Sequence, residues 1–274
     1  MADESAIPAG IEGIDTSRPS IARLYDYLLG GTQNFPIDRE IAAKTLQVVP
    51  QLRDVARDNR AILIRGVRHM AEAGIRQFLD LGSGLPTEQN THQVVQRVAP
   101  DARVVYVDID PLVREHALAL LGDSLHGDTA HTTLVSGDMR RPEEILAHPE
   151  VRSLIDFSEP VGLMMLGVIH HLRDHEDPDG ITTAYREALV PGSLFFLTHF
   201  CASYPDALEL EKTMLATLGT GRFRTEEEIA AYFSGLEMLP PGLVALPEWR
   251  PDAPLSGALS DSQRLMMGGI GRKT

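Results

Sequence analysis

An apolar strand that runs into a glycine turn constrains this sequence more than any other feature. The strand and turn occupy Phe78-Leu79-Asp80-Leu81-Gly82-Ser83-Gly84, and a second apolar segment, Val104-Val105-Tyr106-Val107-Asp108, follows after a gap long enough for a helix. Parallel α/β sheets bind nucleotide-like cofactors at the carboxyl ends of such strands, where a carboxylate accepts the ribose hydroxyls. The pattern therefore predicts a cofactor site that includes Gly82, Gly84 and Asp108.

The glycine spacing narrows the class of cofactor. A dinucleotide turn reads G-x-G-x-x-G, but here Gly84 is followed by Leu85-Pro86-Thr87, and the sequence has no G-x-x-x-x-G-K-[ST] phosphate loop. Both observations disfavour NAD, FAD and nucleoside triphosphates, and leave an NAD-dependent oxidoreductase as a weaker alternative. S-adenosylmethionine, a nucleoside cofactor without phosphates, fits better. Its ribose diol can donate two hydrogen bonds to Asp108, and small glycines let the backbone approach its methionine portion.

Strand-like and helix-like segments alternate from residue 76 onward. Five such alternations predict an α/β fold with a mostly parallel sheet and helices on both faces. A capping box at Thr225-x-x-Glu228 opens another helix, after which residues 242–246 and 264–270 can supply two last strands. The expected parallel strands lie near 76–81, 103–107, 132–136, 161–166 and 193–199, and the expected helices near 87–99, 111–121, 142–148, 179–189 and 205–217.

The segment before residue 76 is predicted to be helical. Apolar residues at helical spacing indicate one helix that begins near Ile21 and stops at Gly30-Gly31, a second that starts near Pro36, and a long third helix from Leu52 to Gly74. The connection to the first strand is short, so these helices are expected to cap the sheet and not to form a separate module. The expected organisation is a flexible tail over 1–16, a helical cap or lid over 17–75 and an S-adenosylmethionine-binding domain over 76–274.

The composition of the chain limits the classes of binding partner that we expect. The net charge is -14, which opposes attraction to phosphate backbones, and the five arginines between residues 53 and 68 are interrupted by Asp54 and Asp58. The single cysteine, Cys201, permits no disulfide within the chain, and no apolar run reaches the length of a membrane span. We therefore expect a cytoplasmic protein with a small-molecule substrate and with neither a nucleic acid nor a membrane as partner. The oligomeric state is left open.

These residues resemble the class I S-adenosylmethionine-dependent methyltransferases, whose first motif places an acidic residue, here Asp80, before a G-x-G turn. Over most of its length the sequence is similar to one uncharacterised family, named simply S-adenosyl methyltransferase. The segments that carry this similarity are Tyr25-Asp26-Tyr27-Leu28-Leu29-Gly30-Gly31, Asn34-Phe35, Asp58-Asn59-Arg60, Gln77-Phe78-Leu79-Asp80, Gly84-Leu85-Pro86-Thr87, Val104-Val105-Tyr106-Val107-Asp108 and Asp110-Pro111.

The resemblance implies a Rossmann-like, mostly parallel sheet of seven strands, of which the last two form an antiparallel hairpin at the edge. It implies S-adenosylmethionine as cofactor, with Asp138 accepting from the adenine amino group, the Met139 backbone next to the ring nitrogen, and Ile109 against the adenine face. The expected cofactor residues are Asp80, Gly82, Ser83, Gly84, Asp108, Ile109, Asp138, Met139, Leu166 and Gly167, together with Tyr25, Asn34 and Arg60 from the cap.

His170 and His171 follow the fourth expected strand, where methyltransferases of this class bring the acceptor to the cofactor sulfur. Both are candidates for a general base, although paired histidines also simply pack. The acidic segment 174–179 could suggest magnesium, but consecutive acids in a loop more often form a turn and a helix N-cap, so no metal is expected. The sequence thus predicts methyl transfer from S-adenosylmethionine to a small molecule. A protein that only binds or senses this cofactor is the alternative from a different class.

Overall fold

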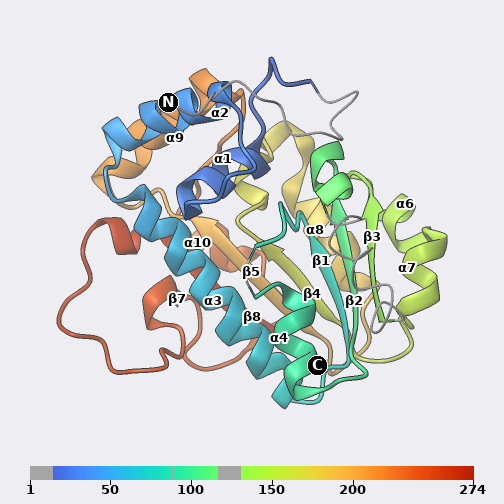
Figure 1. Ribbon diagram of the computed structural model, residues 1–274. Coiled ribbons are helices and arrows are strands. Elements are labelled where there is room, and N and C mark those ends of the chain that lie inside the picture. Colours follow the sequence, from blue (N-terminus) through green and yellow to red (C-terminus); the bar gives the residue numbers. More distant parts are fainter. Residues whose placement is uncertain (1–14, 88, 117–130) are drawn as a thin grey trace.

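The computed structural model describes residues 15–87, 89–116 and 131–274. One sheet lies at the centre with helices on both faces, and the first two helices lie together with a later one at the top of the view (Figure 1). The helices are α1 Ile21–Leu29, α2 Pro36–Val48, α3 Leu52–Glu72, α4 Thr91–Val98, α6 Pro142–Ala147, α7 Pro149–Leu154, α8 Pro178–Glu187, α9 Pro205–Leu218 and α10 Glu226–Ala231.

The sheet has eight strands in the order β3-β2-β1-β4-β5-β8-β6, with β7 also paired to β8. The first five strands are parallel to one another, whereas β8 is antiparallel to β5, β6 and β7. The strands are β1 Gln77–Leu81, β2 Arg103–Asp108, β3 Thr132–Ser136, β4 Gly162–Leu166, β5 Leu194–Phe200, β6 Leu236–Met238, β7 Val244–Ala245 and β8 Met266–Lys273.

The central strands are buried on both faces, which explains their nearly continuous apolar sequences. Successive side chains point to opposite faces. Phe78 and Phe196 therefore belong to one core cluster, which includes residues of α1, α2, α3, α4 and α9. Leu79 and Phe195 belong to a second cluster, with residues of α6, α7, α8 and α10. The apolar faces of the cap helices are thus part of the same core as one face of the sheet.

Local signals start and stop the cap helices as expected. The Ser20 hydroxyl caps α1 by accepting from the Arg23 backbone N–H, and Gly30 ends this helix with a φ of 87° that favours glycine. Pro36 occupies the first turn of α2, where its missing N–H costs nothing. The division into tail, cap and methyltransferase domain stays a prediction, and the expected tail falls almost entirely on residues outside the described part of the chain.

The α/β fold and the five parallel strands are confirmed, and the described residues add one strand and one helix to the expected elements. The sheet has eight strands and not seven, because the three-residue β6 pairs with β8 beyond the expected hairpin of β7 and β8. The helix expected over 142–148 is α6, and a second short helix, α7, follows it, since His148 ends α6 and caps α7. Of the helix expected over 111–121, residues 111–116 are helical and the remainder lies outside the described residues.

Candidate functional site

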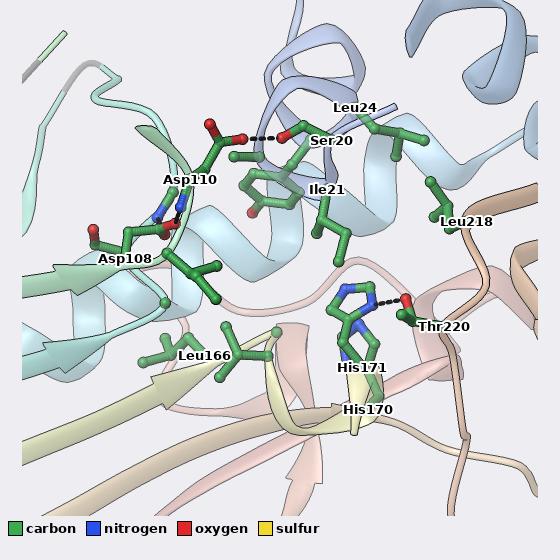
Figure 2. A pocket seen from close by; sticks show the side chains of 18 of the residues that line it. Ser20, Ile21, Leu24, Asp108, Asp110, Leu166, His170, His171, Leu218 and Thr220 are labelled. Carbon is green, nitrogen blue, oxygen red and sulfur yellow. Dashed lines mark hydrogen bonds between the residues drawn. The ribbon is translucent and has the colours of Figure 1, made fainter. Parts of the chain in front are cut away.

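A cavity of about 720 Å³ opens at the carboxyl ends of β1, β2, β3 and β4 and is covered by residues of α1 and α3. Its volume lies within the range of roughly 300–1,000 Å³ that is typical of small-molecule sites. Figure 2 shows Asp108 and Asp110 at one end and Leu218, Thr220 and the histidine pair at the other. We call the first the cofactor end and the second the far end.

The glycine turn after β1 forms one wall of the cofactor end. Gly82 and Gly84 have φ values of 71° and 68°, a region that side chains rarely adopt. A Cβ on Gly82 would lie 2.3 Å from Val168 Cγ1, whereas the space beside Gly84 is open. Between them, the Ser83 hydroxyl is buried and has no hydrogen-bond partner among the described residues. The turn therefore leaves room and a polar group for a ligand.

Asp108 ends β2 and is held in place by backbone groups. Its Oδ2 accepts from the Gly84 N–H at 2.8 Å, and its Oδ1 accepts from the Asp110 N–H at 2.9 Å. Burial raises the pKa of this carboxyl, against the hydrogen bonds from these two amides. Each carboxylate oxygen can accept more than one hydrogen bond. Asp108 is thus oriented at the cavity wall and keeps capacity for a ligand's hydroxyl groups.

Asp80 is the next-to-last residue of β1 and is more deeply buried. Its carboxylate is 5% exposed and accepts from the Thr91 hydroxyl at 2.8 Å. Burial raises the pKa of Asp80 to about 6, although Thr91 and the Arg60 guanidinium act in the opposite direction. Arg60 itself comes from α3 and donates to the Gln89 carbonyl at 2.7 Å, which joins the cap to the glycine turn.

Asp138, at the end of β3, is part of an ion-pair network. The Arg140 guanidinium donates to the Asp138 carboxylate at 2.9 and 3.0 Å and to Glu176 at 2.8 Å. Burial opposes ionisation, but the hydrogen bonds from Arg140 prevail and lower the pKa of Asp138. Met139 lines the cavity beside it, and Ile109 also lines it although its side chain is 62% exposed. An apolar side chain so exposed at a cavity wall offers apolar contact area to a ligand.

The far end carries the histidine pair, in a short 3-10 helix at Ile169–His171 directly after β4. His170 is 3% exposed, and its Nδ1 has no hydrogen-bond partner among the described residues. His171 Nδ1 lies 3.0 Å from the Thr220 hydroxyl. Desolvation lowers the pKa of His171 to about 4 and that of His170 well below its usual value. Both imidazoles are therefore neutral near pH 7.

The structure brings most of the predicted site residues to this one cavity. Leu166 and Gly167 line it at the end of β4, and Tyr25 and Arg60 line it from the cap. Asn34 is different: it does not line the cavity, and its amide donates to the buried Asp26 carboxylate at 2.8 Å. The Tyr25-to-Phe35 sequence pattern is thus partly structural, because Asp26 organises the turn that follows α1.

Two residues at or near the cavity, Ser20 and Thr198, were not singled out from the sequence. Ser20 donates from its hydroxyl to Asp110, which connects the start of α1 to the loop after β2. Thr198 donates to Asn59 at 2.7 Å, and Asn59 donates to the Tyr25 hydroxyl at 3.1 Å, so three segments far apart in sequence meet beside Gly167. These contacts carry no local sequence signal, since each depends on how the cap is placed on the sheet.

The acidic segment after the histidines has structural partners. Asp174 pairs with Arg222 and Arg224, and the Asp177 side chain caps α8 by accepting from the Gly180 N–H, which confirms the expected turn and N-cap. Within the described residues, no three histidine, cysteine, aspartate or glutamate side chains are grouped as a metal site would require. The described helices include none with the length and apolar character to cross a membrane.

Comparisons with known proteins identify the family and the fold. The family described as S-adenosyl methyltransferase matches residues 9–274. A Thermobifida fusca protein assigned as a methyltransferase is 47% identical, with a TM-score of 0.92, and the match covers 97% of this chain and 99% of that one. A DUF574 family protein from Streptomyces avermitilis is 37% identical, with a TM-score of 0.88 and coverage of 95% and 99%. No curated protein matches the sequence.

More distant structures extend the likeness of the fold. An O-methyltransferase family protein from Burkholderia thailandensis has a TM-score of 0.53 at 13% identity, over 87% of this chain and 61% of that one, which confirms a Rossmann-like methyltransferase fold. The family match spans nearly the whole chain, and the matches to the Thermobifida and Streptomyces structures cover almost the full length of those chains. The chain therefore belongs to the S-adenosyl methyltransferase family, whose fold and relatives are those of enzymes that transfer methyl groups.

Proposed function

We propose that this protein transfers a methyl group from S-adenosylmethionine to a small-molecule acceptor. The observation that carries the proposal is one continuous cavity with a carboxylate, Asp108, fixed at the cofactor end and a separate, mostly apolar far end. A protein that only sensed or stored the cofactor would need no second compartment next to it.

The residues at the cofactor end fit S-adenosylmethionine. Asp108 would accept from the ribose hydroxyls, the open backbone at Gly84 would lie along the methionine portion, and the buried Ser83 hydroxyl would gain a partner. Ile109 would cover the adenine, and Asp138 would accept from its amino group. The remaining cofactor contacts are assigned to Asp80, Gly82, Met139, Leu166, Gly167, Tyr25 and Arg60.

When bound, S-adenosylmethionine supplies an electrophilic methyl group on a sulfonium. The protein's part is to align the acceptor in line with that methyl and to exclude water, and alignment alone can contribute roughly 7–11 kcal/mol. His170 and His171 lie where the acceptor would approach. Neutral imidazoles with lowered pKa values can orient an acceptor or take up a proton briefly, but they hold a proton poorly.

Substitution of Asp108 by alanine tests the cofactor assignment. Loss of hydrogen bonds to a charged acceptor costs about 1.5–3 kcal/mol, so calorimetry should show S-adenosylmethionine binding weakened at least about tenfold. Asp101→Asn is the control, because Asp101 is exposed and precedes the same strand at the opposite end. An affinity unchanged in Asp108→Ala, or tighter binding of NAD than of S-adenosylmethionine, would refute the assignment. Methyl transfer to any acceptor separates an enzyme from a sensor.

A further inference from the structure

The far end of the cavity has its own chemical character. Its walls include Leu24 of α1, Leu218 at the end of α9, Phe200 at the end of β5, and the group formed by His170, His171 and Thr220. Phe200 packs against His170 with ring centroids 4.8 Å apart. Apart from the imidazoles and one hydroxyl, these groups offer a ligand only apolar surface.

The charged side chains that line the cavity lie elsewhere. Among the described residues, the carboxylates at the strand ends and the Arg140 network belong to the cofactor end. The charged residues between 15 and 23 belong to the segment that is hydrogen-bonded to the cofactor end through Ser20 and Asp110. Arg60 lies near Asp80, also at the cofactor end. Arg224 is close enough to His170 for its charge to lower the pKa of that histidine, but it is paired with Asp174 and does not line the cavity. A cationic or anionic ligand group at the far end would therefore find no partner among the lining residues, and its desolvation would be costly.

One polar atom at the far end is unsatisfied. His170 Nδ1 is buried and has no hydrogen-bond partner among the described residues, although most buried polar groups in proteins have one. His171, in contrast, has Thr220 at 3.0 Å. A hydroxyl can both donate and accept, so it can satisfy His170 Nδ1 in either neutral tautomer. The far end therefore suits a ligand with one hydroxyl on an apolar body.

We propose that the methyl acceptor is an uncharged, largely apolar molecule that carries a hydroxyl, and that this hydroxyl hydrogen-bonds to His170 at the far end of the cavity. The inference rests on the proposed function, because it takes the cofactor end to be filled by S-adenosylmethionine. It makes His170 a substrate-positioning residue and the end of α9 a determinant of specificity.

Four probes with one ring system test this proposal. The full chain is saturated with S-adenosylhomocysteine, the demethylated product, and then titrated by calorimetry with 2-naphthol, naphthalene, 2-naphthoate and 2-(aminomethyl)naphthalene. We expect 2-naphthol to bind about fivefold more tightly than naphthalene, as one net hydrogen bond allows. We expect both charged probes to bind at least about tenfold more weakly than 2-naphthol.

Two variants sharpen the experiment. His170→Phe keeps an aromatic ring but removes the nitrogen, so 2-naphthol should lose its advantage over naphthalene. Leu218→Lys adds a cation at a half-buried position, so 2-naphthoate should bind at least about fivefold more tightly than to the unmodified protein. The order of the four probes on the unmodified protein needs neither variant to fold.

Several results would overturn the proposal. These are a charged probe that binds as well as 2-naphthol, a preference for 2-naphthol that survives in His170→Phe, or no probe binding to the saturated protein. Failure of S-adenosylhomocysteine to bind would overturn the proposed function and this inference with it. Binding of S-adenosylhomocysteine without the expected order of probes would overturn this inference alone.

Discussion

The ion pair between Arg23 and Asp38 holds the cap together. Asp38 is fully buried, and Arg23 is 3% exposed. The Asp38 carboxylate accepts from Arg23 Nε at 2.8 Å, from the Ser20 N–H at 2.9 Å and from the Phe35 N–H at 2.8 Å. It therefore joins the start of α1 to the start of α2, directly beside the contact between Ser20 and Asp110 at the cofactor end.

Asp38→Asn should strongly destabilise the protein. The change leaves the Arg23 guanidinium buried without a counter-charge, which typically costs about 3–5 kcal/mol. With a urea dependence of about 3 kcal/mol per molar, the midpoint of unfolding should fall by about 1 M or more. Circular dichroism during urea titration measures this midpoint. Affinity for S-adenosylmethionine should also fall, because the contact between the Ser20 N–H and Asp38 that helps to position Ser20 beside Asp110 is weakened.

Asp54→Asn is the matched control. Asp54 also pairs with an arginine at 2.8 Å, Arg57, but both of these side chains are more than half exposed, so the expected cost is about 0–1 kcal/mol. The double variant Arg23→Met with Asp38→Asn should recover part of the loss, because it removes the uncompensated charge. If Asp38→Asn cost no more than Asp54→Asn, the cap would not depend on this buried pair and the reasoning would fail.

Three further predictions concern the core, the cap and the partners. Burial lowers the pKa of His199 to about 3, so between about pH 3 and 6.5 the unfolded chain binds more protons than the folded chain, and the free energy of unfolding falls as the pH falls. His199→Asn should therefore lose about 2 kcal/mol less stability between pH 7 and pH 5 than the unmodified protein does. Urea titrations at both pH values measure this difference. Thr198→Val removes the donor to Asn59 and should cost about 1–3 kcal/mol, and an unchanged midpoint would show that this bridge contributes nothing. Because the net charge is -14, duplex DNA should not bind at physiological salt, and micromolar, salt-sensitive binding in an electrophoretic assay would contradict the small-molecule assignment.

Local patterns were sufficient to predict the parallel strands, the glycine turn and the cap helices. A strand buried on both faces must be apolar throughout, a turn with positive φ favours glycine, and a helix that packs on one side repeats its apolar residues every three to four positions. These requirements act on neighbouring residues, so they are visible in Phe78 to Gly84 and in Ile21 to Gly30 without any knowledge of the fold. The position of Asp108 at a strand end followed from the same logic.

The tertiary structure alone decided which side chains meet. β6 is only three residues long and exists because β8 offers it an edge, so no periodicity marks it. Asn34 is a polar residue of a type that often binds ligands, yet its amide donates to Asp26 and it does not line the cavity. The contacts from Ser20 to Asp110 and from His171 to Thr220 join residues 90 and 49 positions apart. Contacts over such separations depend on how whole elements pack, and packing energy is shared among many residues, so no short stretch of sequence encodes them.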